Sequence, residues 1–369
     1  MLEKVCHIGP AFNVQGGISS VLVSYKKLFN LPERNFIASY NGSFVKSLPQ
    51  FLLLCLKLLL NPPDAPFVQI HTSFNGSFFR KYLISLCLRL RQKKYVAHIH
   101  GSRFKEMCVK SPKIVKRFIR SYFKHSAMVI CITPDMQEFL DDFVGKGLCR
   151  YVVIPNPCDS LADSPVDLNR AGSPVRILFA GRYGHRKGVY DLLEAFKNAN
   201  FDAPAELCLF GDGEVEKVKQ IAECYNAEFA SQELASPEFA GHSKKILVSD
   251  WVSRSDYLKM IPQYDLLALP SYSETFGMSL VEAMGQGLPV VSTFSGGVPF
   301  VVRNGVDGFL VNAGDIDALA QKLKCLVDDR VLRARMGLAA WNGCKERFSG
   351  ENILNLLEHS YSELKKVYA

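Results

Sequence analysis

Two glutamates beside a strand-to-helix turn have residue types and spacing suited to chemistry. Glu274 and Glu282 are separated by seven residues. The pattern around them predicts a buried strand over 266–269, a polar turn over 271–275 and a helix over about 277–286. The first N–H groups of a helix have no internal partner, and the helix dipole favours negative charge there. The sequence therefore predicts an anion-binding site at this turn.

The two carboxylates suggest that this site binds more than an anion. Glu274 lies in the turn, where it either faces a bound ligand or is solvated. Glu282 lies among apolar helix residues, so we expect it to be buried. A buried carboxylate is costly unless it is paired or hydrogen-bonded. Its partners would be hydroxyl donors, such as those of a ribose, or a cation on a neighbouring strand, and the residues alone leave both alternatives open.

A second group of residues is basic. Arg182 and Lys187 lie in a glycine-bearing loop that follows a predicted strand over 175–180. Arginine can bind a phosphate through two donors, whereas lysine acts as a mobile point charge. We favour an anion site at this turn over a solvated basic loop. The pair Gly16-Gly17, which would let the backbone come close to a ligand, is a weaker signal of the same kind.

Two histidines end a strand in the N-terminal half of the chain. His98 and His100 are separated by one residue and precede Gly101. We expect them to face opposite sides of the strand. His100, nearer the carboxyl end, is then the better candidate for a binding site, although a lone histidine is more often a core or loop residue.

An Asp-x-Asp sequence, Asp315 and Asp317, resembles a metal-binding pair. It precedes a predicted helix, where the first aspartate would be an N-cap and the second a first-turn acid. Eleven cysteines are scattered singly and have no zinc-binding spacing. We therefore predict no metal site, and free thiols in a reducing compartment.

Strands alternate with helices in two successive runs, which predicts an α/β fold with two doubly wound parallel sheets. The first run has strands at 5–9, 35–39, 67–71, 95–100, 128–132 and 151–154, and helices at 18–29, 44–60, 77–91, 111–125 and 135–144. The second has strands at 175–180, 206–210, 245–248, 266–269, 289–292 and 308–311, and helices at 188–199, 213–225, 255–261, 277–286, 315–327, 330–343 and 350–367. Ligands of such sheets bind beyond the carboxyl ends of the strands, so we expect the loops of both sheets to face one cleft.

A chain of 369 residues has the length of two ordinary domains. We predict an N-terminal domain over 1–160, a proline-rich linker over 161–174 and a C-terminal domain over 175–349. The last helix, about 350–369, is a candidate to pack back on the first domain.

The net charge of +8 is unevenly spread, because residues 80–125 hold 14 basic residues against one acidic residue, Glu106. This excess predicts an anionic partner, either a membrane or a nucleic acid. The apolar run 51–60 is too short to span a bilayer, and we expect an amphipathic helix lying on the core. Residues 1–9 fit a strand better than a signal peptide, so we expect a cytoplasmic protein.

Several motifs occur together in order. They are Gly181-Arg182-x4-Lys187-Gly188, the two glutamates in Ser-Glu-Thr-Phe-Gly-x4-Glu-Ala-Met, Gly296-Gly297-x-Pro299 and Asn304-Gly305-x2-Gly308. This ensemble resembles glycosyltransferase family 4, whose members are retaining enzymes with the GT-B fold, two facing Rossmann-like domains. The resemblance is strongest over 176–311. The chain departs from the family pattern at Asp250, where a glycine is usual, and at Pro157-Cys158, where Gly-Val is common.

The resemblance implies a nucleotide-diphosphate sugar as co-substrate in the C-terminal domain, an acceptor on the N-terminal domain, and neither metal nor other cofactor. It implies that Arg182 and Lys187 hold the diphosphate, that Glu282 holds the ribose, and that Glu274 and His100 lie beside the donor sugar. These roles make His100, Glu274, Arg182 and Lys187 the candidate catalytic residues. Further candidate donor-binding residues are Gly16, Gly17, Trp251, Val252, Phe276, Gly277 and Met278.

The expected activity is retaining transfer of a hexose or N-acetylhexosamine, with a UDP-sugar the favoured donor. The expected acceptor is a glycan, lipid-linked, in bacterial surface polysaccharide synthesis (O-antigen, lipopolysaccharide, capsule or exopolysaccharide). The basic face of the helix at 111–125 would dock the enzyme peripherally on an anionic membrane, unless that face is simply solvated. The alternatives are a nucleotide-sugar 2-epimerase of the same architecture and a non-enzymatic basic membrane- or nucleic-acid-binding module. We expect no nucleic-acid partner.

Overall fold

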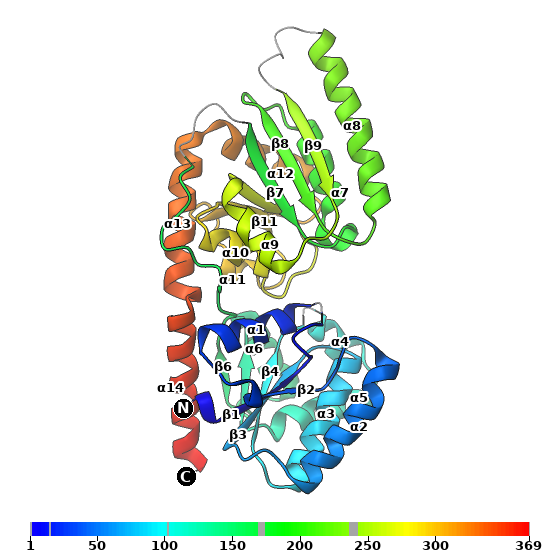
Figure 1. Cartoon of the computed structure of the whole chain (residues 1–369), viewed down its shortest axis with the longest axis vertical. Coiled ribbons are helices and arrows are strands. Elements are labelled where there is room, and N and C mark those ends of the chain that lie inside the picture. Colours follow the sequence, from blue (N-terminus) through cyan, green and yellow to red (C-terminus); the bar gives the residue numbers. More distant parts are fainter. Residues whose placement is uncertain (1, 15, 102, 169–173, 236–242, 369) are drawn as a thin grey trace. The chain divides into compact units, whose positions relative to one another are not determined.

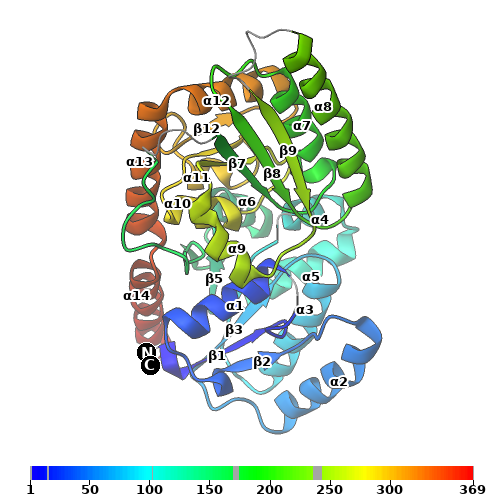
Figure 2. The same ribbon diagram turned by 45° about the horizontal axis from the view of Figure 1, so that its top comes forward.

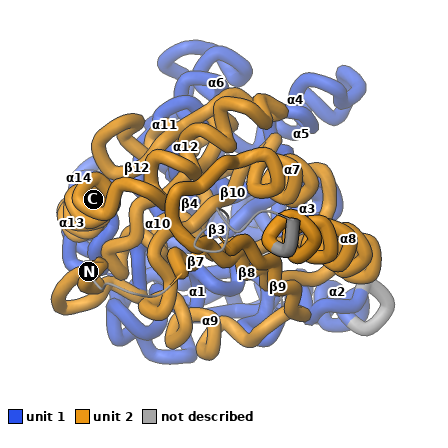
Figure 3. Tube along the Cα trace, turned by 90° about the horizontal axis from the view of Figure 1, so that it is seen from above, with its two compact units in different colours: residues 1–159, 348–369 blue, residues 160–347 orange. Residues whose placement is uncertain are grey.

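The computed structural model describes residues 2–14, 16–101, 103–168, 174–235 and 243–368. The chain forms two compact units, drawn in different colours in Figure 3. Unit 1 comprises Met1–Asp159 and Phe348–Ala369, and unit 2 comprises Ser160–Arg347. Most of the segment that we predicted as a linker therefore belongs to unit 2, while its residues 169–173 lie outside the described residues.

Unit 1 is built on a six-stranded parallel sheet in the order β2-β1-β3-β4-β5-β6 (Figure 1). Its strands are β1 (Val5–Gly9), β2 (Phe36–Ala38), β3 (Phe67–Thr72), β4 (Tyr95–Ile99), β5 (Met128–Cys131) and β6 (Tyr151–Val153). Its helices are α1 (Gly17–Leu28), α2 (Phe44–Leu60), α3 (Gly76–Leu90), α4 (Phe104–Lys110), α5 (Lys113–Lys124), α6 (Pro134–Val144) and α14 (Gly350–Tyr368). One core lies between the sheet and α2, α3, α5 and α6, and the other between the sheet and α1 and α14.

Unit 2 has a second six-stranded parallel sheet, in the order β12-β11-β10-β7-β8-β9. Its strands are β7 (Val175–Ala180), β8 (Ala205–Phe210), β9 (Lys244–Ser249), β10 (Leu266–Leu269), β11 (Val290–Thr293) and β12 (Gly308–Val311). Its helices are α7 (Val189–Asn198), α8 (Val215–Ala235), α9 (Arg254–Met260), α10 (Met278–Gly285), α11 (Val298–Val301), α12 (Ile316–Asp328) and α13 (Arg330–Phe348). Figure 2 shows β7, β8 and β9 side by side.

The strand order of unit 2 reverses between β7 and β10. The chain runs outward from β7 to β9, returns to pair β10 on the other side of β7, and then runs outward to β12. The loops that follow β7 and β10 lead to opposite sides of the sheet. The carboxyl ends of these two strands therefore border the crevice in which open α/β sheets usually bind ligands. The two motifs singled out in the sequence follow these two strands.

The predicted α/β fold with two parallel sheets is confirmed. Two helix ends also have the capping residues that the sequence predicted. At the end of α10, Leu288 N–H donates to Ala283 O at 3.1 Å and Gly287 N–H donates to Met284 O at 2.9 Å, while Gly287 has φ +90°. This is a glycine-terminated Schellman motif. At the start of α12, Asp315 Oδ1 accepts from Ala318 N–H at 3.0 Å, as predicted for an N-cap.

Helix α2 differs from the expectation of an amphipathic helix on the core. Its inner side is buried through Phe51, Leu54 and Leu58. Its outer side is apolar as well, because five leucines are exposed there: Leu48, Leu52, Leu53, Leu56 and Leu60. Among the described residues no helix combines the length and the apolar character needed to cross a bilayer. Helix α2 is therefore a surface helix that is apolar on two sides.

Candidate functional site

Lys187 and Glu274 lie together at the switch point of unit 2. Lys187 Nζ pairs with Glu274 Oε1, and their side chains are only 16% and 10% exposed. Ser271 Oγ donates to the same carboxylate oxygen at 3.3 Å. The sequence analysis placed Lys187 at the diphosphate and Glu274 at the donor sugar. In the structure these two side chains contact each other directly.

The loops that carry these residues are held together by their backbones. Tyr272 N–H donates to Arg186 O at 2.9 Å. Gly188 has φ +69°, and a Cβ there would lie 2.0 Å from Pro270 O, so only glycine permits this approach. The Tyr272 hydroxyl donates to Asp191 Oδ2 at 2.8 Å. The loop after β7 and the turn after β10 therefore form one packed structure.

A third loop fixes the turn from the other side. Gly297 N–H donates to Glu274 O at 3.3 Å. Gly296 has φ +52°, and a Cβ there would lie 1.9 Å from Glu274 O. The Gly-Gly-x-Pro sequence after β11 thus supports the backbone of Glu274.

Arg182 lies apart from the Lys187–Glu274 pair. It is exposed, and its side chain runs along Gly213, where a Cβ would come within 3.1 Å of Arg182 Cγ. In the part of the chain that the structure describes, Arg182 forms no ion pair. Its guanidinium is thus available to an anion at the surface of the loop.

Glu282 is buried in α10, as predicted, and is only 3% exposed. Its Oε1 pairs with Arg254 Nη1 at 2.6 Å. Burial and the nearby Glu282 raise the pKa of the Tyr257 phenol well above its ordinary value. The cation that the buried carboxylate requires is therefore supplied by helix α9, and not by a neighbouring strand.

Sequence reasoning missed Arg254. The signal available was indirect, because a buried glutamate demands a cation but nothing in the chain specifies which one. Ser253 caps α9 by accepting from Asp256 N–H at 3.2 Å, which places Arg254 in the first turn of the helix.

The loop after β9 holds the candidate base-binding residues. Trp251 is 54% exposed and Val252 is half-buried. Tyr183 donates its hydroxyl hydrogen to Ser249 O at 2.7 Å, which ties this loop to the loop after β7. Asp250, the departure from the family pattern, is exposed and pairs with Lys219 at 3.7 Å. Asp250 therefore has a partner on helix α8.

The start of α10 contributes backbone donors to the same end of the sheet. Gly277 caps the helix with φ +81°, Phe276 is buried, and the first turn carries no acidic residue. The leading N–H groups of an α-helix lack acceptors within the helix. Gly277 and Met278 thus lie where an anion could accept hydrogen bonds.

The remaining candidates belong to unit 1, at the carboxyl ends of its strands. Gly16 caps α1 and Gly17 begins it, with open space where their Cβ atoms would lie. His100 follows β4, and its Nε2 lies 3.0 Å from Nδ1 of His71 on β3. Burial lowers the pKa of His100 to about 3, so its imidazole is neutral near pH 7.

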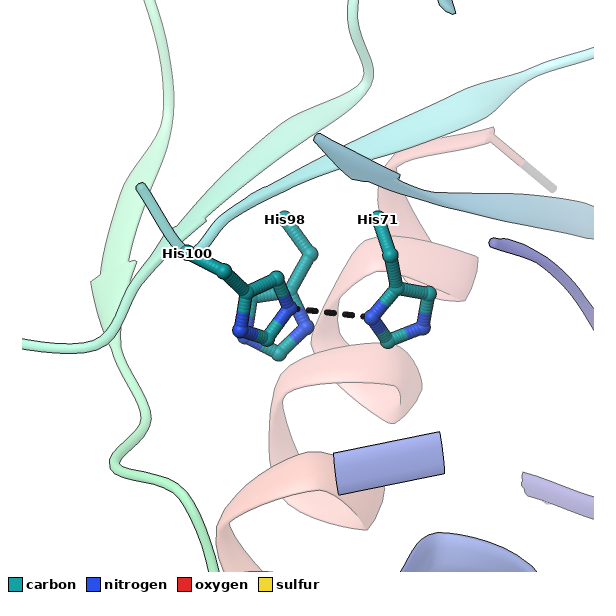
Figure 4. A group of neighbouring side chains, drawn as sticks. All are labelled: His71, His98 and His100. Atoms are coloured by element: carbon teal, nitrogen blue, oxygen red, sulfur yellow. Dashed lines mark hydrogen bonds between the residues drawn. The ribbon is translucent and has the colours of Figure 1, made fainter. Parts of the chain in front are cut away.

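The expectation that His98 and His100 face opposite sides of the strand is wrong. Their rings lie 4.0 Å apart between centroids, on the same face (Figure 4). Successive strand residues alternate, so residues two apart share a face. His71, which the sequence analysis did not single out, stacks on His100 with centroids 5.1 Å apart.

The chain is similar to a known protein family and to several known proteins. The family model described as "Glycosyl transferases group 1" matches residues 162–342. A lipopolysaccharide core biosynthesis glycosyltransferase, LpsE of Rhizobium meliloti, is 28% identical over 246 residues, which is 63% of each chain. The chain thus spans less than two thirds of the length of this relative.

Two further similarities cover more of the chain. An Escherichia coli enzyme named UDP-Gal:alpha-D-GlcNAc-diphosphoundecaprenol alpha-1,3-galactosyltransferase is 25% identical over 307 residues, covering 79% of this chain and 73% of the relative. The crystal structure of HepE of Anabaena in complex with UDP and glucose superposes with a TM-score of 0.71 at 19% identity, covering 97% of this chain and 99% of HepE. The likeness to HepE concerns the fold.

Proposed function

Because the chain belongs to the glycosyl transferases group 1 family, with the GT-B fold, we propose that it is a retaining hexosyltransferase. It moves a hexose or N-acetylhexosamine from a nucleotide-diphosphate sugar, with UDP-sugars the favoured donors, to a glycan acceptor. The lipopolysaccharide and lipid-linked substrates in the names of two relatives favour a lipid-linked acceptor in surface polysaccharide synthesis. No metal or other cofactor is needed for the transfer.

The Lys187–Glu274 pair at the switch point of unit 2 is the observation on which the proposal rests. It puts a cation and a carboxylate beside the start of α10, at the sheet position where open α/β folds bind ligands. A diphosphate bound there would draw Lys187 away from Glu274 and release the carboxylate toward the sugar. Arg182 and the first N–H groups of α10 would hold the remaining phosphate charge.

Breaking the anomeric C–O bond builds negative charge on the departing diphosphate and positive charge on the sugar ring. Lys187, Arg182 and the helix start stabilise the first. Glu274 orients hydroxyl groups or stabilises the cationic ring. The acceptor attacks the face that the diphosphate leaves, and the leaving phosphate oxygen takes the acceptor proton. His100, which is neutral, serves as a hydrogen-bond partner of the donor sugar.

The remaining proposed contacts are with the ribose and the base of the donor. Glu282, already paired with Arg254, accepts hydrogen bonds from the ribose hydroxyls, while Trp251 and Val252 border the base. By resemblance to the family, Gly16 and Gly17 at the start of α1 are further candidates for donor binding.

A screen of nucleotide sugars for thermal protection tests the proposal. We expect a UDP-sugar to raise the melting temperature, and Arg182→Ala and Lys187→Ala each to weaken its binding by roughly tenfold or more, since hydrogen bonds to charged groups contribute about 1.5–3 kcal/mol. Lys197→Ala, which removes a surface lysine paired with Glu228, is the matched control and should bind the donor normally. Unchanged donor binding in the Arg182 and Lys187 variants would contradict the proposal.

Product analysis then separates the candidate reactions. A retaining transferase makes product only with an acceptor and keeps the anomeric configuration of the donor, which nuclear magnetic resonance reads directly. A 2-epimerase would convert the donor without any acceptor, and a non-enzymatic module would convert nothing. Transfer should continue in the presence of EDTA, and its loss would contradict metal independence.

The membrane face of this proposal lies on unit 1. Helices α2 and α3 pack side by side, and α3 also packs against α5 (Figure 1). The outer side of α2 exposes its five leucines, and α3 adds Phe79, Leu83 and Leu90. Helix α5 turns outward the basic residues Lys113, Lys116, Arg117, Arg120 and Lys124. An apolar surface continuous with a basic one suits the interface of an anionic bilayer, on the cytoplasmic side where nucleotide sugars are made.

Vesicle flotation tests this face. The wild-type chain should float with phosphatidylglycerol vesicles, and the double variant Leu53→Glu/Leu56→Glu should lose roughly tenfold or more in partitioning because it removes apolar surface. Lys113→Glu/Arg117→Glu should also weaken flotation, by about 1 kcal/mol per basic residue removed. Leu338→Glu, at an exposed leucine of α13, is the control and should float as the wild type does. Equal flotation with neutral phosphatidylcholine vesicles would count against an anionic partner.

A further inference from the structure

Two buried imidazoles and a partly buried one gather at the carboxyl ends of β3 and β4. One ring nitrogen from each of His71, His98 and His100 lies within 4.8 Å of the other two. Figure 4 shows the three rings turned toward one another, with His71 and His100 joined by a hydrogen bond. Nothing in the proposed glycosyl transfer requires more than His100.

Two of the three rings have a partner behind the cluster, whereas Nδ1 of His100 is buried without a hydrogen-bond partner among the described residues. Nε2 of His71 lies 3.3 Å from Nδ1 of His7 on β1. Nδ1 of His98 lies 2.7 Å from Nε2 of Gln69, and Oε1 of Gln69 accepts from the Tyr361 hydroxyl at 2.8 Å. Metal-binding histidines almost always have such an outer partner, which orients the ring.

Gln69 leaves one nitrogen of His98 for another ligand. Because an amide side chain offers both a donor and an acceptor, Gln69 can engage Nδ1 of His98 in either orientation. Nε2 of His98 is fully buried and has no hydrogen-bond partner among the described residues. A buried polar atom without a partner costs about 1–3 kcal/mol, which a bound ion would recover.

Neutral imidazole is the form that binds a metal, so each ring must offer one nitrogen without a proton. An ion bound to His71 Nδ1 and His100 Nε2 replaces the hydrogen bond between them, and the displaced proton moves to Nδ1 of His100, while Nε2 of His71 keeps its hydrogen bond to His7. Lys81, which is buried and acts electrostatically on His71, opposes the ion when it is protonated.

From this geometry we infer that His71, His98 and His100 form a site for a divalent transition-metal ion of the zinc class. Three nitrogen ligands with a fourth position left to solvent or an anion are typical of zinc. Mg²⁺ and Ca²⁺ prefer oxygen ligands and bind imidazole poorly. His100 is only partly buried, which gives the ion an entry path. Since a bound ion would occupy His100, the site would restrain transfer rather than assist it. The sequence has no zinc-binding spacing that would reveal this site, because its ligands come from two separate strands.

Zn²⁺ titration of the untagged, metal-free chain tests the site by calorimetry, and Co²⁺ supplies a visible spectrum that reports nitrogen coordination. We expect one saturable Zn²⁺ ion per chain and the absorption bands of four-coordinate Co²⁺. His98→Gln and His100→Ala should each weaken Zn²⁺ binding by roughly tenfold or more. His125→Ala removes an exposed histidine of the same unit and should change nothing.

The wild-type chain alone can refute the inference, even if a variant fails to fold. Absence of saturable Zn²⁺ binding, or a Co²⁺ spectrum of a six-coordinate aquo ion, would overturn the site. Binding that survives His98→Gln and His100→Ala, or that is lost in His125→Ala, would also overturn it. These readouts involve no sugar nucleotide, so they are independent of whether the chain is a glycosyltransferase.

Discussion

Lys187 and Glu274 illustrate, at the scale of single residues, how a site group can also stabilise the fold. Each is mostly buried and each neutralises the other. Removing one partner leaves the other charge largely desolvated, which costs more than the pair itself contributes.

We therefore expect a non-additive response in a double-mutant cycle. Lys187→Ala and Glu274→Ala should each lower the free energy of unfolding, and the double variant should lose about 0.5–3 kcal/mol less than the sum of the two. Urea denaturation at neutral pH measures this. Strict additivity would show that the two charges do not interact in solution.

Lys81 gives a prediction that depends on pH. Burial, with a smaller contribution from Arg80, lowers its pKa to about 7 from an ordinary value of 10.5. Between these values the unfolded chain binds more protons than the folded chain, so this residue makes stability rise with pH through that window. Below pH 7 the folded state carries the full cost of the buried charge.

Lys81→Met should remove this dependence. The difference in unfolding free energy between wild type and variant should change by roughly 1 kcal/mol per pH unit from pH 8 to pH 9, in the direction that favours the wild type. Urea denaturation at several pH values measures it. Lys217→Met, at an exposed lysine of α8, is the control and should show a constant difference.

At the scale of elements, hydrophobic patterns predicted most strands of both sheets to within one or two residues. The strands that match best, such as β7 and β10, are short apolar runs between polar turns. The helix predictions were less accurate. Helices α4 and α11 were missed because they are short. Helix α8 extends to Ala235, ten residues beyond the predicted end.

The candidate site was predicted in part. Glu274, Lys187 and the burial of Glu282 follow from residue types at a predictable turn. Arg254 and His71 do not, because pairing partners from other elements depend on how the elements pack.

The loops that carry the site depend on particular glycines. Gly188→Ala should cost several kcal/mol, because it combines a left-handed backbone with a Cβ 2.0 Å from Pro270 O. Gly305→Ala is a matched control with φ +78° and open space around the Cβ, and it should cost only about 1–2 kcal/mol. Thermal denaturation of the two variants measures the difference, and equal costs would show that the loop after β7 relaxes freely.

At the scale of the whole molecule, the chain leaves unit 1 at Asp159 and returns to it at Phe348. Helix α14 then covers one face of the first sheet through buried side chains: Ile353, Leu357, Tyr361 and Leu364. The apolar pattern predicted this helix, and the sequence analysis named it as a candidate to pack on the first domain, but the pattern does not specify which face of the sheet it covers.

Truncation after Phe348 should therefore destabilise unit 1 selectively. Fully burying one large apolar side chain contributes about 1.5–3 kcal/mol, so losing four of them should lower or abolish the transition of unit 1. The two tryptophans, Trp251 and Trp341, both lie in unit 2. Tryptophan fluorescence should thus keep its transition while circular dichroism shows an earlier loss of structure, and a parallel shift of both would contradict the division.

The hydrogen bond from Tyr361 to Gln69 joins residues that are 292 positions apart. On the ribosome, β3 and β4 are made long before Tyr361 emerges, so Gln69 and the imidazole it orients stay unsupported until synthesis has passed Tyr361. Unit 2, whose residues form one uninterrupted segment, can mature earlier. The first unit to be synthesised is thus the last to be completed.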